Sequence, residues 1–461
     1  MKDEFPSTVS DAGGAHYALG AMLGHGGQGA VFAVRGRPLA VKLLNAATPT
    51  ARLRTQEAVA RVKRLPLEGL TVARPLRALA HPHVGYVMEL MTGMGPLSSL
   101  SSVPESRSAD IAPWYLETGG LRRRLRLLAR AAEILAELHG RGLVYGDASP
   151  ANIFVSDDGE AQEVWLIDCD NVDSGVSRRA VYTPGYAAPE LFRSRGSDSL
   201  TDAWSFATIA FQTLCALHPF IGDAVHDGDP EYEARAFEGL LPWVDDPSGE
   251  NEASRGLPRD MVLTPDLAEL AEACFGRSRT DRQARPGVAT WAEKLHRAAD
   301  QALDCPGCGS SYYLNRRSCP WCDAPRSAFA VASVYLRDPE LTDRQRNPFS
   351  LVCREAGRPR PIHRVALQAG RPLPLSDRIL RGSAAHGPVL EARLEAQRLT
   401  LVGGVEAGWV LRHQSGKELP LGGRTEHLDL GAGPRSWWLL PQAAQGLHRA
   451  IAFEWVPEVQ P

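Results

Sequence analysis

The stretch YGDASPAN, residues Tyr145–Asn152, is the most informative part of this chain. Asp147 and Asn152 lie within it, and Asp168 ends the apolar run VWLI that follows. One carboxylate can orient an attacking hydroxyl, while an amide oxygen and a second carboxylate can hold Mg²⁺ against phosphates. The spacing therefore predicts a site for phosphoryl transfer.

Upstream, the run GHGGQGAV at Gly24–Val31 fits the pattern Gly-x-Gly-x-x-Gly-x-Val. Glycines let a backbone loop close over phosphates because no Cβ atoms stand in the way. The short strand that follows carries Lys42, from which an ammonium group can reach the α- and β-phosphates. These residues predict a nucleotide-binding loop followed by a phosphate-binding lysine.

Taken together, these motifs resemble the protein kinase family, in matching order over residues 17–299. TPGYAAPE at 183–190 resembles the end of an activation segment, and DAWSF at 202–206 resembles the start of the central helix. Arg285 resembles the late arginine that pairs with the glutamate of APE, here Glu190.

The resemblance implies a bilobal α+β kinase fold, with an N-lobe at 17–90 and a C-lobe at 91–300, and Mg²⁺-ATP-dependent phosphorylation of protein serine or threonine. It assigns Asp147 to the substrate hydroxyl, and Asn152 and Asp168 to Mg²⁺. The nucleotide contacts that it implies are Gly24, Gly26, Gly29, Val31, Ala40, Lys42, Met88, Glu89, Met91, Asn152 and Asp168.

A polar helical stretch at Thr50–Arg64 is expected to supply the carboxylate that pairs with Lys42. Glu57 is the candidate because of its position after the lysine strand, and Glu68 is its competitor. The alternative is that Glu57 is a solvated helix residue.

The catalytic loop departs from the usual HRD pattern. Gly146 replaces the arginine that grips a phosphorylated activation segment, so activity should not depend on such phosphorylation. Ser149 replaces the lysine that steadies the transferred phosphate; it can donate a hydrogen bond to phosphate but brings no charge. Asp170 replaces the glycine of DFG. It is either tolerated at an unusual backbone angle, which we favour, or an added acceptor near the metals.

Within the activation segment, Ser174 and Ser177 are the phosphosite candidates, whereas Thr183 is expected to hydrogen-bond the catalytic aspartate. Leu121–Gly140 has apolar residues at helical spacing, and its arginines are either a solvated face or a docking surface for an acidic partner. Asp202 is expected to cap the central helix and to hold the catalytic loop from beneath.

These substitutions resemble a bacterial branch of protein kinases in which YGD or HGD precedes SPxN, often followed by a zinc ribbon. In that branch the kinase is often associated with a metal-dependent protein phosphatase and a von Willebrand A-type protein. The resemblance implies these two as partners.

Four cysteines in CPGC and CPWC, namely Cys305, Cys308, Cys319 and Cys322, have the spacing of two zinc knuckles. Disulfides or scattered buried thiols are the alternatives, and neither suits paired CPxC turns in a chain with no signal peptide at its start. The spacing predicts a structural zinc ribbon at 301–326.

Short β-rich runs separated by Gly and Pro turns fill 327–461 and predict an all-β sandwich or barrel that acts as an interaction domain. A forkhead-associated-like sandwich is one possibility. Trp437 and Trp438 either bind a partner or pack in the core. The predicted strands are Ala328–Leu336, Leu390–Ala396, Leu399–Val402, Trp409–Leu411, His427–Leu430, Trp437–Leu440 and Ile451–Trp455.

Composition sets limits on these interpretations. A chain of 461 residues with 44% hydrophobic residues has material for two or three domains. Its net charge of -3 gives no reason to expect nucleic acid or a membrane as partner. Residues 1–16 form a polar, flexible lead-in without the apolar core of a signal peptide, so a cytoplasmic protein is expected.

Two other functions remain open at this stage. A pseudokinase scaffold would bind nucleotide and present the β domain to partners, and the missing HRD arginine and lysine favour it. A small-molecule kinase is disfavoured by the intact TPGYAAPE segment, which resembles a platform for protein substrates.

Overall fold

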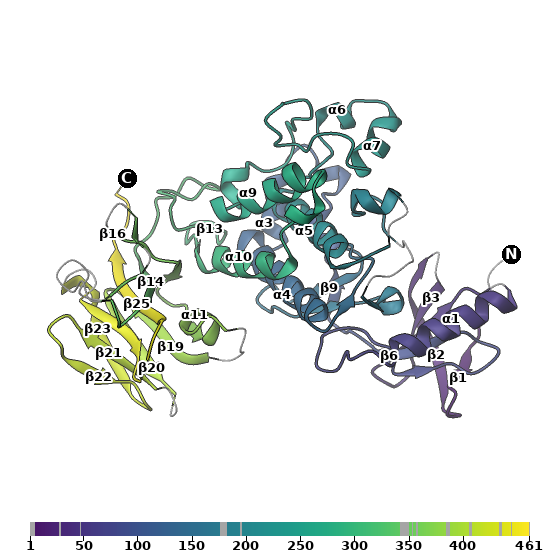
Figure 1. The fold of residues 1–461 in the computed structure, drawn as a ribbon, viewed down its shortest axis with the longest axis horizontal. Coiled ribbons are helices and arrows are strands. Elements are labelled where there is room, and N and C mark those ends of the chain that lie inside the picture. The colour runs from purple at the N-terminus through teal and green to yellow at the C-terminus, as the bar shows by residue number, and fades with distance from the viewer. Residues whose placement is uncertain are drawn as a thin grey trace. The chain divides into compact units, whose positions relative to one another are not determined.

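The computed structural model describes residues 5–26, 29–46, 48–175, 182–193, 196–341, 350–352, 354–355, 358–383, 388–404, 408–432, 436–443 and 445–460. The chain forms two compact units, Met1–Leu295 and His296–Pro461, which Figure 1 colours from purple to green and from green to yellow.

An antiparallel sheet of six strands opens the first unit, in the order β1-β2-β3-β4-β6-β5. Helix α1 (Pro49–Val62) follows β4 and begins with Thr48 as its N-cap and a proline in its first turn. These elements confirm the strands and the helix predicted for this region. The strands are β1 (Thr8–Ser10), β2 (His16–Gly26), β3 (Gly29–Val34), β4 (Leu39–Leu44), β5 (Arg77–Ala78) and β6 (Gly85–Glu89).

The two faces of this sheet have different neighbours because side chains alternate along each strand. Pairing of β3 with β4 places Val31 opposite Lys42, and pairing of β4 with β6 places Ala40 opposite Met88. Val31, Lys42, Ala40 and Met88, four of the expected nucleotide contacts, therefore share one face. The opposite face carries the apolar core of the lobe, formed by Val9, Tyr17, Leu19, Ala30, Phe32, Val34, Val41, Leu43, Leu79 and Val87.

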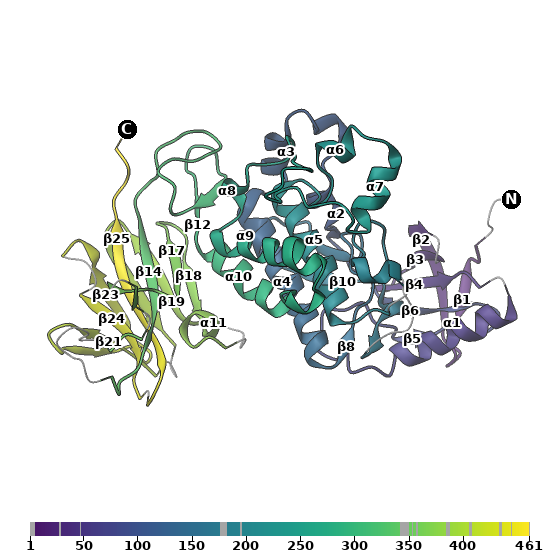
Figure 2. The same cartoon turned by 45° about the horizontal axis from the view of Figure 1, so that its top comes forward.

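Helices make up most of the rest of the first unit, and α5 lies among the others in Figures 1 and 2. Two small antiparallel sheets accompany them, one of β7, β9 and β10 and one of β8 and β11. The helices are α2 (Ser98–Ser101), α3 (Ile111–Glu117), α4 (Gly120–Gly140), α5 (Ser199–Cys215), α6 (Asp223–His226), α7 (Pro230–Phe237), α8 (Arg259–Val262), α9 (Pro265–Ala271) and α10 (Val288–Asp300). The strands are β7 (Met94–Pro96), β8 (Leu143–Val144), β9 (Ile153–Ser156), β10 (Val164–Leu166) and β11 (Asp173–Ser174).

Helix α5 is the centre of the helical lobe. Its side chains are almost all buried, and Trp204 stacks on Phe220 and meets Phe275 edge to face. Asp198 is its N-cap and accepts from the backbone N–H groups of Leu200 and Thr201. The predicted capping role of Asp202 is therefore wrong, because the helix begins earlier and Asp198 already accepts its first free amides.

The arginines of α4 do not all form a solvated face. Arg124 is 0% exposed, and it donates to the backbone oxygens of Leu100, Tyr115 and Gly120 and to Thr118 Oγ1. Its guanidinium also lies 3.9 Å from the centre of the Tyr115 ring. Both predicted interpretations are wrong for Arg124, since its charge is satisfied inside the lobe.

Replacing this buried cation should be costly. We expect Arg124→Met to lower the free energy of unfolding by about 3 kcal/mol or more, because several backbone oxygens lose their donors inside the lobe. Arg130→Met on the same helix removes a solvent-accessible pair with Glu133 and should cost less than about 1 kcal/mol. Urea denaturation measures both, and equal losses would contradict the structural role of Arg124.

The second unit begins at His296, within α10, and continues with a hairpin of β12 (Ala302–Asp304) and β13 (Ser311–Tyr313), followed by two antiparallel sheets. The larger sheet has the order β17-β14-β25-β24-β21-β22, and the smaller has the order β18-β19-β20-β23. Their strands are β14 (Phe329–Arg337), β17 (His363–Leu367), β18 (Leu373–Ser376), β19 (Pro388–Glu395), β20 (Arg398–Gly403), β21 (Trp409–His413), β22 (Glu418–Pro420), β23 (Thr425–Asp429), β24 (Trp437–Pro441) and β25 (His448–Val456). The remaining elements are the hairpin of β15 (Arg354–Glu355) and β16 (Arg358–Pro359), and helix α11 (Asp377–Leu380).

Side chains from both sheets form one apolar cluster, to which the larger sheet contributes Leu411 and Ile451 and the smaller sheet Leu390 and Leu401. The domain is therefore a sandwich and not a closed barrel. Every strand predicted in this region is present, whereas β15, β16, β17, β18 and β22 were not predicted. Trp438 is 4% exposed and Trp437 packs against the core, so packing accounts for both.

Candidate active site

The catalytic loop lies between β8 and β9 and is held from below by helix α5. Asp202, 1% exposed, accepts the backbone N–H of Tyr145 at 2.7 Å and that of Gly146 at 2.9 Å. Its Oδ2 also lies 3.0 Å from Nε2 of His139 at the end of α4. The predicted role of Asp202 beneath the loop is confirmed, and one buried carboxylate sets the loop's backbone.

Asp147 follows directly and is partly buried. Its Oδ1 accepts a hydrogen bond of 2.9 Å from Thr183 Oγ1, which confirms the contact predicted for that threonine. Burial raises the pKa of Asp147; the Thr183 bond opposes this shift and the Asp168 carboxylate adds to it. A carboxylate with one oxygen oriented and a raised pKa is a suitable acceptor for a hydroxyl proton.

Tyr145 and Asn152 tie the two ends of the loop to the strand that leads to Asp168. The buried hydroxyl of Tyr145 donates to the backbone oxygen of Ile167. Asn152 Nδ2 donates to the backbone oxygen of Asp147 at 3.0 Å. The bond uses the amide nitrogen of Asn152 and leaves its carbonyl oxygen as the atom that a divalent cation would take.

The turn after β10 brings two carboxylates toward the N-lobe. Asp168 has φ of 59°, in the left-handed region, and Cys169–Asn171 form a short 3₁₀ helix. Asp170 is not among the residues with positive φ. Our preferred explanation of Asp170, tolerance of an unusual backbone angle, is therefore wrong, because the unusual angle belongs to Asp168.

Lys42, 7% exposed, is bound by this turn. Its Nζ pairs with Asp168 Oδ1 and lies 2.6 Å from Asp170 Oδ2. Burial favours the neutral amine, but the charges of Asp170 and Asp168 outweigh it and raise the pKa of Lys42. The lysine is therefore a cation at neutral pH.

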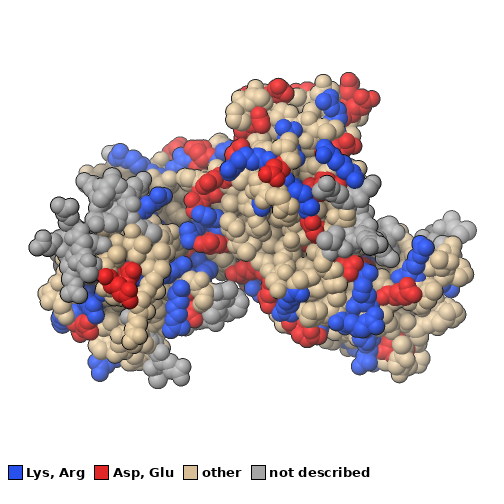
Figure 3. All heavy atoms as spheres, viewed as in Figure 1, with Lys and Arg blue, Asp and Glu red and all other residues tan. Residues whose placement is uncertain are grey.

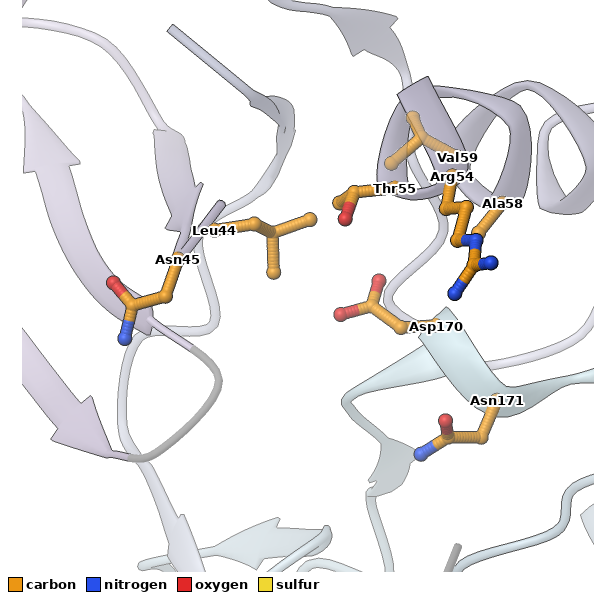
Figure 4. Close-up of a pocket in the computed structure, with 8 residues that line it drawn as sticks. All are labelled: Leu44, Asn45, Arg54, Thr55, Ala58, Val59, Asp170 and Asn171. Carbon is orange, nitrogen blue, oxygen red and sulfur yellow. The ribbon is translucent and has the colours of Figure 1, made fainter. Parts of the chain in front are cut away.

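Helix α1 turns Glu57 away from this site, so the predicted pair of Lys42 with Glu57 is wrong for this structure. Thr55, Ala58 and Val59 face a cavity of about 340 Å³ that Asp170 also lines (Figure 4). At about 100° per residue, Glu57 lies some 200° around the helix from Thr55 and is exposed. Glu68 pairs with Arg74 and does not replace it.

The predicted nucleotide contacts surround the exposed end of the N-lobe sheet. Gly24 and Gly26 are exposed at the end of β2, with open space where a Cβ would stand. Gly29 has φ of 154°, and a Cβ there would lie 1.9 Å from the backbone oxygen of Leu43. Glu89 ends β6 and Met91 follows it, both accessible to solvent. The exposed glycines leave room for phosphates, and the accessible backbone at Glu89 and Met91 can contact a base. These positions fit a bound nucleoside triphosphate with Mg²⁺.

Comparison with family models matches residues 17–294 to the protein kinase domain. The chain belongs to the protein kinase family. CBL-interacting protein kinase 4 of Oryza sativa subsp. japonica is 30% identical over 56% of this kinase and 56% of its own length. The DNA damage-responsive serine/threonine-protein kinase RqkA of Deinococcus radiodurans is 28% identical over 62% of this kinase and 40% of its own length. Serine/threonine-protein kinase pkn2 of Myxococcus xanthus is 29% identical over 58% of this kinase and 33% of its own length.

The kinase spans about half or less of the length of these relatives. Within the described residues, no helix is long and apolar enough to cross a membrane.

Ser149, which stands where the family usually has a lysine, has a buried side chain in this kinase. It is 1% exposed, and its hydroxyl oxygen is buried without a hydrogen-bond partner among the described residues. The phosphate contact of Ser149 therefore stays a prediction, and in this structure the side chain is shielded from solvent. Its place after Ala148 in a tight loop, with Pro150 next, accounts for the burial.

The kinase ties the end of its activation segment to the C-lobe through Glu190. Arg285 donates to both of its carboxylate oxygens, at 2.8 and 3.2 Å, which confirms the predicted pair. Burial raises the pKa of Glu190, but the bonds and charge of Arg285 outweigh it and hold that pKa below its ordinary value. Arg282, which was not predicted, adds contacts to Glu190 and to the helix cap Asp198. Its position three residues before Arg285 was the signal in the sequence that could have predicted this role for Arg282.

Of the phosphosite candidates, Ser174 is exposed at the end of β11. Ser177 lies outside the described residues.

His218 was also missed, and it fixes the activation segment from the other side. Its Nε2 donates to the backbone oxygen of Gly185 at 2.8 Å, and its Nδ1 accepts from the backbone N–H of Phe220 at 3.2 Å. These partners require the neutral imidazole. Tyr186, Phe220 and Phe237 surround the ring, and burial lowers the pKa of His218 to about 4.

The kinase should consequently lose stability in acid through His218. The unfolded chain binds a proton below about pH 6.5 and the folded chain only below about pH 4, so stability falls as pH decreases between these values. We expect His218 to account for about 2 kcal/mol of the loss between pH 7 and pH 5.

Urea unfolding of the wild type and His218→Gln at both pH values measures this contribution. The variant keeps a donor for Gly185 but cannot be protonated, so its loss should be smaller by that amount. The exposed His226→Gln is the control and should behave as the wild type. An identical pH dependence in all three proteins would exclude the effect.

In the second unit, the four cysteines form a compact cluster of free thiols. The Sγ atoms of Cys305 and Cys322 are 3.6 Å apart, and those of Cys308 and Cys319 are 3.7 Å apart. Sulfurs about 2.3 Å from a tetrahedral zinc ion would be about 3.8 Å apart. The cluster therefore has the dimensions of one four-thiolate zinc site.

The two knuckles repeat the same turn. Gly309 donates its backbone N–H to the oxygen of Cys305, and Asp323 does the same to Cys319. Both residues have a left-handed backbone conformation, with φ of 71° for Gly309 and 59° for Asp323. The shared backbone geometry is what directs each pair of thiols to one point.

Proposed function

We propose that this protein is a Mg²⁺-ATP-dependent serine/threonine protein kinase that acts in bacterial signalling. The observation that carries the proposal is the position of Asp147, fixed by Thr183 from the activation segment and followed by Asn152. A substrate hydroxyl beside Asp147 and a bound Mg²⁺-ATP would complete the groups that phosphoryl transfer requires. The kinase family match and the bacterial serine/threonine kinase relatives support the proposal.

In this mechanism each side chain has one role. Asp147 accepts the hydrogen bond of the substrate hydroxyl, orients it and takes its proton as the oxygen attacks the terminal phosphorus. Lys42 binds the α- and β-phosphates, and the glycine-rich end of β2 covers them. Asn152 and Asp168 hold Mg²⁺, which when bound neutralises charge that develops on the phosphate oxygens.

The loop geometry supports activity without phosphorylation of the activation segment. Gly146 has φ of 87°, and a Cβ there would lie 3.2 Å from the backbone oxygen of Asn171. A glycine brings no cation for a phosphate on the segment. Asp202 and Thr183 hold the loop instead. Asp202 accepts two backbone N–H groups of the loop and Thr183 donates to Asp147, and neither interaction needs a phosphate.

Transfer of radiolabel from ATP tests the activity. We expect Asp147→Asn and Asp168→Asn each to lower kcat by at least about 100-fold, since they remove the base and a metal ligand. Asp158→Asn, at an exposed turn, is the matched control and should retain full activity. Label should appear on serine or threonine.

If the wild type binds Mg²⁺-ATP but transfers no label to itself, a generic protein substrate or a neighbouring gene product, the scaffold function replaces the enzyme.

We also propose that Cys305, Cys308, Cys319 and Cys322 bind one structural zinc ion, which the sulfur separations support. Metal analysis of the purified chain should find about one zinc per chain. Cys319→Ser should release it and lower the melting temperature, because metal binding and folding of the knuckles are coupled. Cys215→Ala, in the buried core of α5, should keep the zinc. A zinc-free wild type that melts cooperatively would contradict the site.

The bacterial branch with its phosphatase and von Willebrand A-type partners is proposed from the YGDASPAN loop and the ribbon alone. Purification of the tagged kinase from its own cells should recover both partners. Their absence, with the kinase intact, would contradict this part of the proposal.

A further inference from the structure

The position of a phosphate-binding lysine must be set by a fixed anion, because a long flexible side chain otherwise samples many conformations. In this chain Lys42 is nearly buried and lies on β4, on the face opposite the apolar core. Among the residues that the structure describes, its ion-pair partners are Asp168 and Asp170. Both belong to the turn after β10, and neither belongs to α1.

The face of α1 that points to the site carries no carboxylate. Thr55, Ala58 and Val59 line the cavity, and the charged residue that α1 adds to its lining is Arg54 (Figure 4). An arginine on this face repels a lysine and attracts an aspartate. The residues by which α1 lines this cavity therefore supply no anion for Lys42.

The backbone of the turn explains how Asp170 fills this role. Residues Cys169–Asn171 form a single 3₁₀ turn whose first residue is buried, so Asp170 is held rigidly beside the lysine. Its side chain is 15% exposed and that of Lys42 is 8% exposed, so the pair is largely shielded from solvent. Shielded pairs are strong enough to fix a side chain when both charges are compensated.

We propose that Asp170 is the positioning residue for Lys42 and replaces a helix glutamate in that role. This proposal rests on the kinase activity proposed above. One turn then carries both the metal-binding Asp168 and the anion that sets the lysine. The turn therefore positions Lys42 and the metal-binding Asp168 at the same time. No movement of α1 is needed to bring a carboxylate to Lys42.

Rigid coupling has a consequence for regulation. A partner that displaces α1 would change the cavity beside Asp170 but would leave the pair of Lys42 with Asp170 intact. Control of this kinase is accordingly expected at the turn after β10 or at the activation segment.

The first test needs neither activity nor metal. Melting temperatures are measured in EDTA for the wild type, Asp170→Asn, Lys42→Met and the double variant. We expect Asp170→Asn to lower the melting temperature of the wild type by about 5 °C or more, since it leaves Lys42 short of one partner. In the Lys42→Met background the same substitution should raise it, because it removes a buried carboxylate that has lost its cation.

The change of sign is diagnostic of the pair. It can be read from Lys42→Met and the double variant even if Asp170→Asn alone folds poorly. A lowering of similar size in both backgrounds would overturn the proposal. The matched control, Glu57→Gln, should leave the melting temperature of Lys42→Met unchanged, and stabilisation by Glu57→Gln equal to that by Asp170→Asn would also overturn it.

The second test separates positioning from simple binding. At saturating ATP, Asp170→Asn should lower kcat at least tenfold, whereas Glu57→Gln should stay within twofold of the wild type. In the Lys42→Met background Asp170→Asn should change the residual kcat less than twofold, because it acts through the lysine. A full effect in that background, or equal losses in the Asp170 and Glu57 variants, would overturn the proposal. If the wild type is inactive, the proposed function fails while the melting cycle still decides the pair.

Discussion

The structure of the first unit depends on one buried carboxylate. Asp202 stands in the first turn of α5, whose own N-cap is Asp198, and its two oxygens accept the backbone amides that precede the catalytic aspartate. Removing such a carboxylate would leave two amides unpaired inside the protein, which costs far more than the hydrogen bonds contribute on average. The catalytic loop is therefore as rigid as the central helix to which it is tied.

A second constraint is electrostatic. Lys42 and the carboxylates of Asp168 and Asp170 come from opposite lobes, and a buried cation needs nearby anions to stay charged. The interaction that keeps the lysine ionised also joins the strand β4 to the turn after β10. The groups proposed to bind phosphate and metal are consequently positioned relative to each other by a direct contact.

Figure 3 shows how the remaining charges are distributed. On the face in view, Lys and Arg side chains mix with Asp and Glu side chains, among the residues that the structure describes. The charges that hold the first unit together are the buried or half-buried ones, where solvent screens them least. Arg124, Arg285 and Lys42 belong to this class, and each is paired or hydrogen-bonded.

The second unit shows a similar dependence on buried polar contacts. Asp300, in the last turn of α10, pairs with His363 on β17 and with Arg378 on α11, and these contacts outweigh burial and hold the pKa of Asp300 well below its ordinary value. The cysteine knuckles and the start of β14 share one apolar cluster, which includes Tyr312 and Phe329. The ribbon is thus packed on the sandwich and is part of the same compact unit.

The sequence by itself determined the order of elements, the kinase family and the residues Asp147, Asn152 and Asp168, because local motifs carry fixed spacings that chemistry requires. It also determined the cysteine knuckles and most strands of the sandwich, since alternation and turn residues are local signals. Only the tertiary structure decided which carboxylates face Lys42 and that Arg124 and Ser149 are buried. The rotation of α1 and the packing of α4 depend on contacts between segments far apart in the chain, and no local pattern encodes them.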